Sequence, residues 1–215
     1  KQSCDTYFYE ITRKLGVDRL KETSVKFGLG EKVLKETFSI EKKGLVPDTQ
    51  WKKNNLGKSW VIGETLITGI GQGYTQTTPL QLCLMTAQLA NGGFKIYPKI
   101  IVDENSNTAE DIRIIINENR KELNKRNSGL QDATNLLRLP NKKEHEPLFK
   151  NPKNIKLVRE AMFASTNEVR GTSYASRIED PKYQFAGKTG TSQVKRISEK
   201  DRELNLKTFE IPYNE

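Results

Sequence analysis

The chain is poor in the residues that bind metal ions. Its 215 residues include two cysteines, Cys4 and Cys83, and a single histidine, His145. A protein zinc site usually takes three or four cysteine, histidine or carboxylate ligands, and His145 lies in a polar segment far from either cysteine in sequence. We therefore expect no metal site. Whether the two cysteines form a disulfide depends on geometry that the sequence leaves open.

Long apolar runs are also missing. Hydrophobic residues make up 34% of the chain, and no run approaches the roughly 18–20 residues that cross a bilayer. No apolar stretch follows a charged start at the N-terminus, so no signal peptide is visible. The chain begins with Lys1 in place of a methionine. This start suggests a fragment, and a membrane anchor could precede it.

The basic balance of the chain does not predict nucleic-acid binding. The net charge is +9, but the lysines and arginines are scattered, and no basic stripe alternates with aromatic residues as nucleic-acid-binding proteins require. A basic surface equally favours an anionic polymer or a membrane surface. We expect no nucleic-acid partner. The alternative, an unrelated basic binding module, would bind nucleic acid with an affinity that falls as salt rises.

Two helices are indicated in the first thirty residues. Asp5 can cap a helix that runs to Gly16, where glycine stops it. Asp18 starts a second, shorter helix that is closed by Gly28. Residues 29–58 are rich in turn-forming residues, which predicts loops around short extended pieces.

Two more helices begin at proline signals. Residues 78–79 (Thr-Pro) are a strong helix start, because proline at the first helical position loses no hydrogen bond. This helix runs to residue 90 and is apolar nearly all round, so we expect it to be buried, with Cys83 as a small core residue. Residues 94–98 resemble a short edge strand that ends at a proline. Asn151 begins the last helix.

Residues 103–150 differ in composition from the rest. They are rich in asparagine and charge and have few apolar clusters. Such a segment cannot bury enough apolar surface to offset the entropy of ordering it. We expect a polar insertion or mobile excursion inside one domain, of which residues 1–215 are a part.

The most informative motif lies near the C-terminal end. Lys188, Thr189 and Gly190 follow a short apolar segment, which predicts a strand that carries an ammonium group and a hydroxyl, while Gly190 lets a substrate backbone approach closely. Thr191 adds a further hydroxyl. Residues 3–5 (Ser-Cys-Asp) place another hydroxyl and a carboxylate at a helix start. Both tripeptides occur in serine acyl transferases of the penicillin-binding and β-lactamase type.

Each tripeptide alone carries little weight, but the order of motifs along the chain is informative. The matching segments are residues 3–9, 16–20, 26–28, 69–74 (Gly-Ile-Gly-Gln-Gly-Tyr), 78–81 (Thr-Pro-Leu-Gln), 171–172 and 187–194. In this order they resemble the class B penicillin-binding proteins, most of all the elongation-type penicillin-binding protein 2 group. The resemblance covers residue 1 to about residue 200, apart from residues 103–150.

The resemblance implies a fold and a reaction. The fold is α+β, with helices flanking an antiparallel five-stranded sheet, and it would be incomplete at both ends of this chain. The reaction is peptidoglycan cross-linking by D,D-transpeptidation, in which a serine attacks a D-Ala-D-Ala stem peptide and the acyl group then passes to an amine on a neighbouring strand. No cofactor is implied, since proton relay and oxyanion stabilisation suffice for acyl transfer.

The resemblance also implies roles for five side chains. Ser3 would relay a proton to the leaving amine, and Asp5, at a position where the family often has asparagine, would position that network. Lys188 would hold Ser3 electrostatically and attract the substrate carboxylate. Thr189 and Thr191 would bind that carboxylate, and the backbone N–H of Thr191 would form half of the oxyanion hole. Strict strand alternation puts Lys188 and Thr189 on opposite faces, which the family resolves by presenting the edge of the strand.

The nucleophile of the family is missing from its usual place. A Ser-x-x-Lys motif should precede Ser3, and its serine and lysine must share a helical turn for the lysine to take the hydroxyl proton. Residues 39–42 have the spacing but follow Ser3 in a turn-rich region. Residues 192–195 have it on the predicted Lys-Thr-Gly strand. We assign no nucleophile in this chain and expect the isolated chain to be inactive.

Other interpretations and the implied partners follow from the same family. A non-catalytic, penicillin-recognising sensor or pseudoenzyme of the same fold is the main alternative, whereas the Gly-Gln-Gly loop and Thr-Pro-Leu-Gln helix disfavour a β-lactamase. The implied partners are peptidoglycan stem peptides, β-lactams and a membrane-embedded glycan polymerase. The implied location is the periplasmic face of the bacterial inner membrane, through an N-terminal anchor that this chain lacks.

Overall fold

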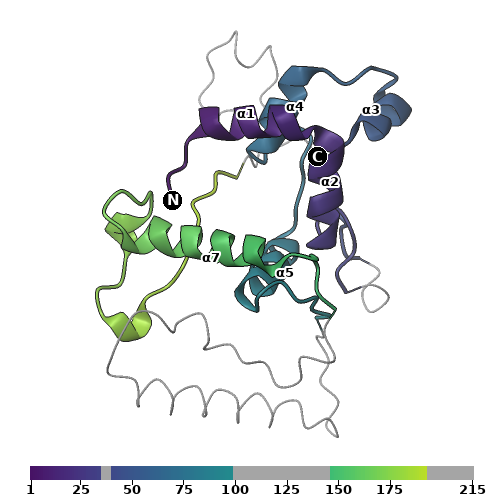
Figure 1. Cartoon of the computed structure of the whole chain (residues 1–215). Coiled ribbons are helices and arrows are strands. Elements are labelled where there is room, and N and C mark those ends of the chain that lie inside the picture. The colour runs from purple at the N-terminus through teal and green to yellow at the C-terminus, as the bar shows by residue number, and fades with distance from the viewer. Residues whose placement is uncertain (35–39, 99–145, 193–215) are drawn as a thin grey trace, which may run out of the picture.

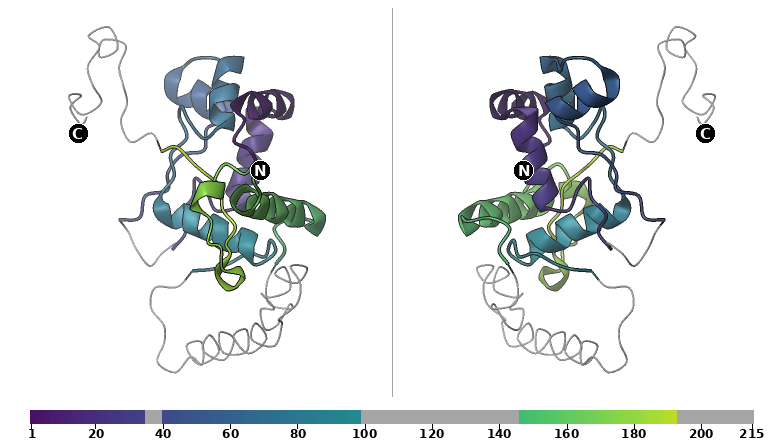
Figure 2. Two further views of the ribbon diagram at one scale, coloured as in Figure 1. Left: turned by 90° about the vertical axis from the view of Figure 1, so that its left-hand side faces the viewer. Right: turned by 90° about the vertical axis from the view of Figure 1, so that its right-hand side faces the viewer.

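The computed structural model describes residues 1–34, 40–98 and 146–192. Figure 1 shows two groups of helices, with α1, α2 and α4 packed together and α5 lying against α7. The views in Figure 2 keep the same grouping. The helices are α1 (Asp5–Leu15), α2 (Val17–Lys26), α3 (Thr49–Leu56), α4 (Ile62–Gly69), α5 (Pro79–Ala90) and α7 (Pro152–Asn167), followed by the 3-10 helices η1 (Tyr174–Ser176) and η2 (Pro181–Tyr183).

The helices expected from capping signals are present. The first ends at Gly16, whose φ of 82° suits glycine and whose N–H donates to Thr12. The hydroxyl of Thr78 accepts from the N–H of Gln81 at the start of α5, and Asn151 caps α7. Two details are corrected. Cys4 is the N-cap of α1, and Asp5 is its first helical residue with no capping bond. The second helix begins at Val17 after Gly16, and the Asp18 carboxylate accepts hydrogen bonds from Thr49 instead of capping it.

Two helices lie where the sequence analysis assigned none. α3 begins after Asp48, whose carboxylate accepts the N–H of Trp51 at 2.6 Å, and it ends at Gly57 in the left-handed conformation. α4 begins where the carboxylate of Glu64 accepts the N–H of Val61 at 2.9 Å. Both helices are only eight residues long. Neither is long enough to show a clear apolar period, and α3 lies within residues 29–58, which were expected to form loops.

Strand pairing among the described residues is limited to two isolated bridges, Leu45 with Gln76 and Phe94 with Pro147. The strand expected at 94–98 is therefore reduced to a single bridged residue, Phe94. Its bridge is made by two bonds, from the Lys95 N–H to the Glu146 carbonyl and from the Leu148 N–H to the Gly93 carbonyl. Residues 184–192 have no ladder partner in the described part of the chain. The expected antiparallel sheet is not seen in these residues.

The interior around α5 is largely polar. Gln81 is fully buried, and its amide donates to the carbonyls of Glu31 and Lys43 at 2.7 and 2.8 Å. Gln88 is also buried and donates to the carbonyl of Phe27 at 3.0 Å. Because each buried carbonyl needs a donor, these glutamines fasten loops of the first helix group onto α5.

The expectation that α5 is buried all round is wrong. Leu82 and Cys83 are exposed, and the buried positions lie along one face, at Gln81, Leu84 and Gln88. These positions are three and four residues apart, which is the spacing of one helix face. Cys83 is thus not a core residue, and both cysteines are free thiols on the surface.

Most of the segment expected to be a polar insertion, residues 103–150, lies outside the described residues. Within the described ranges no helix is long and apolar enough to span a membrane. The same ranges contain no group of three or more histidine, cysteine, aspartate or glutamate side chains placed to hold a metal ion.

Candidate active site

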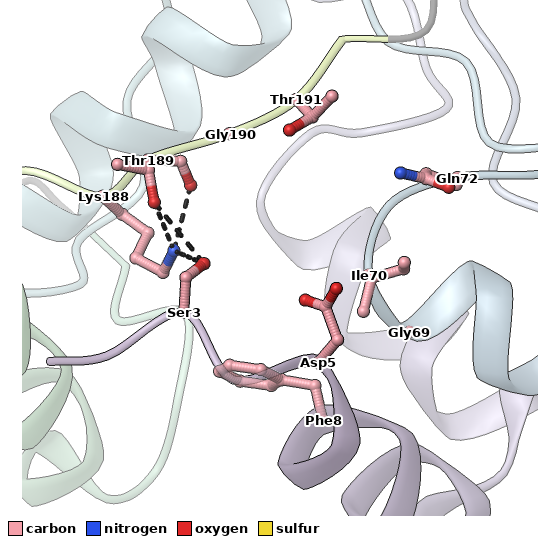
Figure 3. A pocket seen from close by; sticks show the side chains of 10 residues that line it. All are labelled: Ser3, Asp5, Phe8, Gly69, Ile70, Gln72, Lys188, Thr189, Gly190 and Thr191. Atoms are coloured by element: carbon pink, nitrogen blue, oxygen red, sulfur yellow. Dashed lines mark hydrogen bonds between the residues drawn. The ribbon is translucent and has the colours of Figure 1, made fainter. Parts of the chain in front are cut away.

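Residues from the two ends of the sequence meet at one place. The Lys188 ammonium donates to the hydroxyl of Ser3 at 2.8 Å. It also donates to the carbonyl and the hydroxyl of Thr189, at 3.0 and 3.1 Å. The two hydroxyls of Ser3 and Thr189 are themselves 3.5 Å apart. The prediction that Ser3 and Lys188 meet is confirmed (Figure 3).

The backbone around Lys188 explains how neighbouring side chains share a partner. In a regular strand Lys188 and Thr189 would point to opposite faces. Residues 184–192 are not in a ladder among the described residues, and both side chains reach Ser3. All these side chains are exposed, so the cluster is open to a ligand.

A pocket of about 310 Å³ lies beside this cluster. Ser3 and residues 188–191 form one wall. The opposite wall comes from α1 and from the loop after α4, and it contains Asp5, Phe8, Gly69, Ile70 and Gln72 (Figure 3). The pocket therefore has an ammonium and hydroxyls on one side and a carboxylate with an apolar patch on the other.

Asp5 and Thr191 line the pocket without joining the Ser3–Lys188 cluster. The Asp5 carboxylate projects into the pocket (Figure 3), but no hydrogen bond joins it to Ser3 in the described residues. Thr191 projects toward the pocket from the same segment as Lys188. The structure brings all six predicted site residues to one pocket; it gives hydrogen bonds to three of them, Ser3, Lys188 and Thr189.

The opposite wall is set by a close crossing of α1 and α4. A Cβ atom on Gly69 would lie 2.2 Å from the Thr12 hydroxyl oxygen and 2.6 Å from its Cβ. Thr12 is buried and its hydroxyl donates to the carbonyl of Phe8. The glycine therefore lets α4 approach α1, and Phe8 of α1 and Ile70, which follows α4, line the same pocket.

A buried ion pair joins α3 to α4, the helix that leads into this wall. The Lys52 ammonium donates to the Glu64 carboxylate, with side chains only 6% and 18% exposed. Glu64 also accepts from the hydroxyl of Tyr74 at 3.2 Å, and the Tyr74 ring packs on Trp51 and Trp60. Burial raises the pKa of Glu64, but the bonds from Lys52, Val61 and Tyr74 outweigh burial and leave it below its usual value.

Cys4, next to Ser3, also has a lowered pKa. Its sulfur lies 3.2 Å from the Thr6 hydroxyl. This hydrogen bond, with a second one from the Tyr7 backbone, lowers the pKa of the Cys4 thiol. The position at a helix start favours a thiolate in the same direction.

Comparison with known proteins gives the family. Residues 1–209 match the model of the penicillin binding protein transpeptidase domain. The chain belongs to this transpeptidase family. It is 31% identical over 206 residues to peptidoglycan D,D-transpeptidase MrdA of Acinetobacter baumannii, covering 93% of this chain and 25% of the relative. It is 30% identical over 227 residues to MrdA of Escherichia coli, covering 100% of this chain and 31% of the relative. The chain thus spans about a quarter to a third of the length of these transpeptidases.

Solved structures of the same family are similar in fold. Penicillin-binding protein 2 of Pseudomonas aeruginosa, in complex with WCK 5153, superposes with a TM-score of 0.61 at 34% identity. That match covers 88% of this chain and 36% of the other. Penicillin-binding protein 2 of Helicobacter pylori, in complex with MreC, gives 0.64 at 27% identity and covers 88% and 29%. The predicted resemblance to the penicillin-binding protein 2 group is confirmed.

Several residues of this pocket were not predicted as site residues. Phe8, Gly69, Ile70 and Gln72 line it, although the glycine-rich segment that holds three of them was part of the family resemblance. The clustering of glycines in residues 69–74 was the sequence signal that could have identified these residues as part of the pocket. The two Ser-x-x-Lys spacings considered for a nucleophile lie partly outside the described residues, at Ser39 and Lys195.

Proposed function

We propose that this chain is part of a D,D-transpeptidase that cross-links peptidoglycan by acyl transfer from D-Ala-D-Ala stem peptides, and that β-lactams bind the same site. The observation that carries the proposal is the hydrogen bond of 2.8 Å between Lys188 and Ser3, which are 185 residues apart in the sequence. Its setting, an exposed cluster on the wall of a pocket in a transpeptidase-family chain, supports a catalytic rather than a purely structural role.

The roles follow from charge and hydrogen bonding. Acylation forms a bond between a serine oxygen and the peptide carbonyl carbon and breaks the bond to the terminal D-alanine, whose nitrogen must gain a proton. Lys188 stabilises the oxygen of Ser3 as Ser3 relays that proton. The substrate carboxylate, which carries a full negative charge, is attracted to the ammonium of Lys188 and accepts hydrogen bonds from the hydroxyls of Thr189 and Thr191.

The remaining parts of the site stabilise the reacting carbonyl. The backbone N–H of Thr191 supplies one donor to the oxyanion, an effect worth roughly 3–4 kcal/mol of barrier in comparable sites. Gly190 adds no side chain between this backbone and the substrate. Asp5 positions the relay from the opposite wall. The attacking serine is not assigned within this chain, and we propose that the chain alone is inactive.

We further propose that the complete domain contains the antiparallel sheet of the family. A membrane-embedded glycan polymerase is the proposed partner, and the periplasmic face of the inner membrane is the proposed place of action. The second candidate function is a sensor or pseudoenzyme of the same fold, which would bind penicillin without transferring stem peptides.

The test uses fluorescent penicillin with the full gene product and with the isolated chain. We expect a covalent adduct on the gene product and none on the chain. Ser3→Ala and Lys188→Ala should each lower the acylation rate by about 10²–10⁴-fold, the usual contribution of a proton-transfer group. Thr23→Val, an exposed threonine on α2 that bonds only its own helix, should leave the rate unchanged.

Three outcomes contradict parts of the proposal. An adduct on the isolated chain refutes its inactivity. Equal rates for wild type and Lys188→Ala refute the catalytic role of the cluster. If the protein takes up penicillin but releases no D-alanine from a stem pentapeptide, its function is that of a sensor and not of a transpeptidase.

A further inference from the structure

The two halves of the Ser3–Lys188 cluster are held by the same element, the C-terminal end of α7. Ser3 arrives from the N-terminus and Lys188 from the segment after η2, and neither is part of a helix. Their separation must therefore be fixed by something outside their own local structure. Hydrogen bonds from the end of α7 and the turn that follows it reach both.

Thr172 makes three hydrogen bonds to the N-terminal segment. Its hydroxyl accepts the N–H of Ser3 at 3.0 Å and donates to the carbonyl of Lys1 at 3.3 Å. Its own N–H donates to the same carbonyl at 3.4 Å. Glu168, in the same turn, forms an ion pair with the Lys1 ammonium. The backbone of Ser3 is thus fixed by one side-chain hydroxyl.

The turn that carries Thr172 is itself packed tightly on α7. A Cβ atom on Gly171 would lie 2.2 Å from the carbonyl oxygen of Ser165. The N–H of Gly171 donates to Glu168 at 2.7 Å, and that of Ser173 donates to Ser165 at 3.0 Å. This close approach leaves the Thr172 hydroxyl little freedom relative to the helix.

The Lys188 segment is bound one turn away on the same helix. The amide of Asn167 donates to the carbonyl of Phe185 at 2.9 Å and to its own helix at Phe163 at 3.0 Å. The N–H of Gly187, next to Lys188, donates to the carbonyl of Met162 at 3.2 Å. Helix α7 and the turn after it therefore hold the Ser3 segment and the Lys188 segment at a defined spacing.

We propose that Thr172 is a positioning residue for the transpeptidase reaction, with Asn167 as its counterpart on the Lys188 segment. The Thr172 hydroxyl fixes the backbone of Ser3, so that the Ser3 oxygen meets the Lys188 ammonium. The expected effect on the acylation rate rests on the proposed function, whereas the expected effect on the Ser3–Lys188 distance does not. Loss of the hydroxyl frees Ser3, and a displacement of about 1 Å at a reacting group lowers the rate by about a hundredfold.

The experiment compares Thr172→Val with Thr172→Ser in the full gene product. Valine keeps the size of threonine and removes the hydroxyl, whereas serine keeps the hydroxyl. Thr23→Val is the matched control, since Thr23 is also an exposed threonine with a hydroxyl hydrogen bond. Two quantities are measured: the distance between Ser3 Oγ and Lys188 Nζ in crystals, and penicillin acylation divided into initial affinity and rate constant.

We expect Thr172→Val to lengthen the distance beyond hydrogen-bond range and to lower the acylation rate constant about a hundredfold, with initial affinity unchanged. Thr172→Ser and Thr23→Val should match wild type. A Thr172→Val protein that keeps the Ser3–Lys188 hydrogen bond overturns the proposal, whatever its acylation rate. So does an equal loss in Thr172→Ser. If valine impairs folding, Thr172→Ala repeats the test without the methyl group that valine puts in place of the hydroxyl.

Failure of the proposed function is recognised separately. If the wild-type gene product takes up no penicillin, the transpeptidase assignment fails, while the crystallographic distance still decides whether Thr172 positions Ser3. If wild type is acylated but the distance is the same in all variants, the positioning role fails and the function stands.

Discussion

The Lys188 ammonium has three protons, and three acceptors surround it. They are the Ser3 hydroxyl, the Thr189 carbonyl and the Thr189 hydroxyl, all between 2.8 and 3.1 Å. An ammonium group has no further donor. A ligand carboxylate that binds Lys188 must therefore replace one of the bonds to Thr189, or share it, while the bond to Ser3 is kept. The site is thus a preorganised pair of the Ser3 hydroxyl and the Lys188 ammonium, in which a ligand oxygen can take the place of a Thr189 oxygen.

The lowered pKa of Glu64 predicts how the stability of the fold depends on pH. Its pKa lies below the usual value, so the unfolded state binds its proton more readily than the folded state. Stability from this group is therefore present above the ordinary glutamate pKa of about 4.3 and is lost as the pH falls below it. We expect the free energy of unfolding of the wild type to fall in that acid range. In Glu64→Gln, which has no carboxyl group at this position, the fall should be smaller.

The same variant should be less stable at neutral pH. It leaves the buried Lys52 ammonium without its charge partner, which costs about 3–5 kcal/mol. Chemical denaturation at pH 7 and at several acid values measures both effects. Glu179→Gln is the control, because Glu179 pairs with Arg177 while 80% exposed, and exposed pairs contribute about 0–1 kcal/mol. Equal curves for the two variants would show that the buried pair has no special role.

At the scale of elements, the crossing of α1 and α4 depends on one glycine. Gly69→Ala places a methyl group 2.2 Å from the Thr12 hydroxyl oxygen. Because Thr12 is buried and cannot move aside freely, the helices must separate, and we expect a loss of about 1–3 kcal/mol of stability. The pocket wall at Ile70 would shift with α4. Thermal unfolding and the rate of penicillin acylation by the full gene product measure the two consequences.

The matched control lies in the same helix. A Cβ atom on Gly63 would meet no atom within 4 Å in the described residues beyond its chain neighbours and the backbone of its own helix, so Gly63→Ala should stabilise α4 by roughly 0.5 kcal/mol through its better helix propensity. The two substitutions are chemically identical and are expected to act in opposite directions. A similar effect of both would mean that the α1–α4 approach does not limit the fold.

The elements also show what the sequence could and could not predict. Helix ends with strong signals, such as Thr78-Pro79, were predicted correctly because capping is a local effect. The eight-residue helices α3 and α4 were not, since each is too short to show a period and is held by tertiary bonds such as Lys52 with Glu64. Cys83 was placed in the core because its helix is apolar on every side, whereas packing chose only one face. The Ser3–Lys188 contact came from family motifs; no local pattern joins residues 185 positions apart.

At the scale of the whole molecule, the pocket lies between the two helix groups. Asp5, Phe8 and Ile70 come from the group of α1 and α4, whereas Lys188 is held by α7. Gln88, bonded to the carbonyl of Phe27, is one of the links that join the groups in the interior. A ligand in this pocket contacts both groups at once, and it binds the folded chain only, because the unfolded chain has no pocket.

Ligand binding should therefore stabilise the whole chain. At ten times its dissociation constant, N-acetyl-D-Ala-D-Ala is expected to raise the free energy of unfolding by about 1.4 kcal/mol, the mass-action value for a ligand that binds only the folded state. Thermal unfolding of the isolated chain measures the shift without any need for a nucleophile. The L,L-dipeptide is the control for nonspecific effects of a carboxylate. Lys188→Ala should abolish the shift, because it removes the charge that attracts the carboxylate; a shift that survives in this variant would place the dipeptide somewhere other than the Ser3–Lys188 pocket.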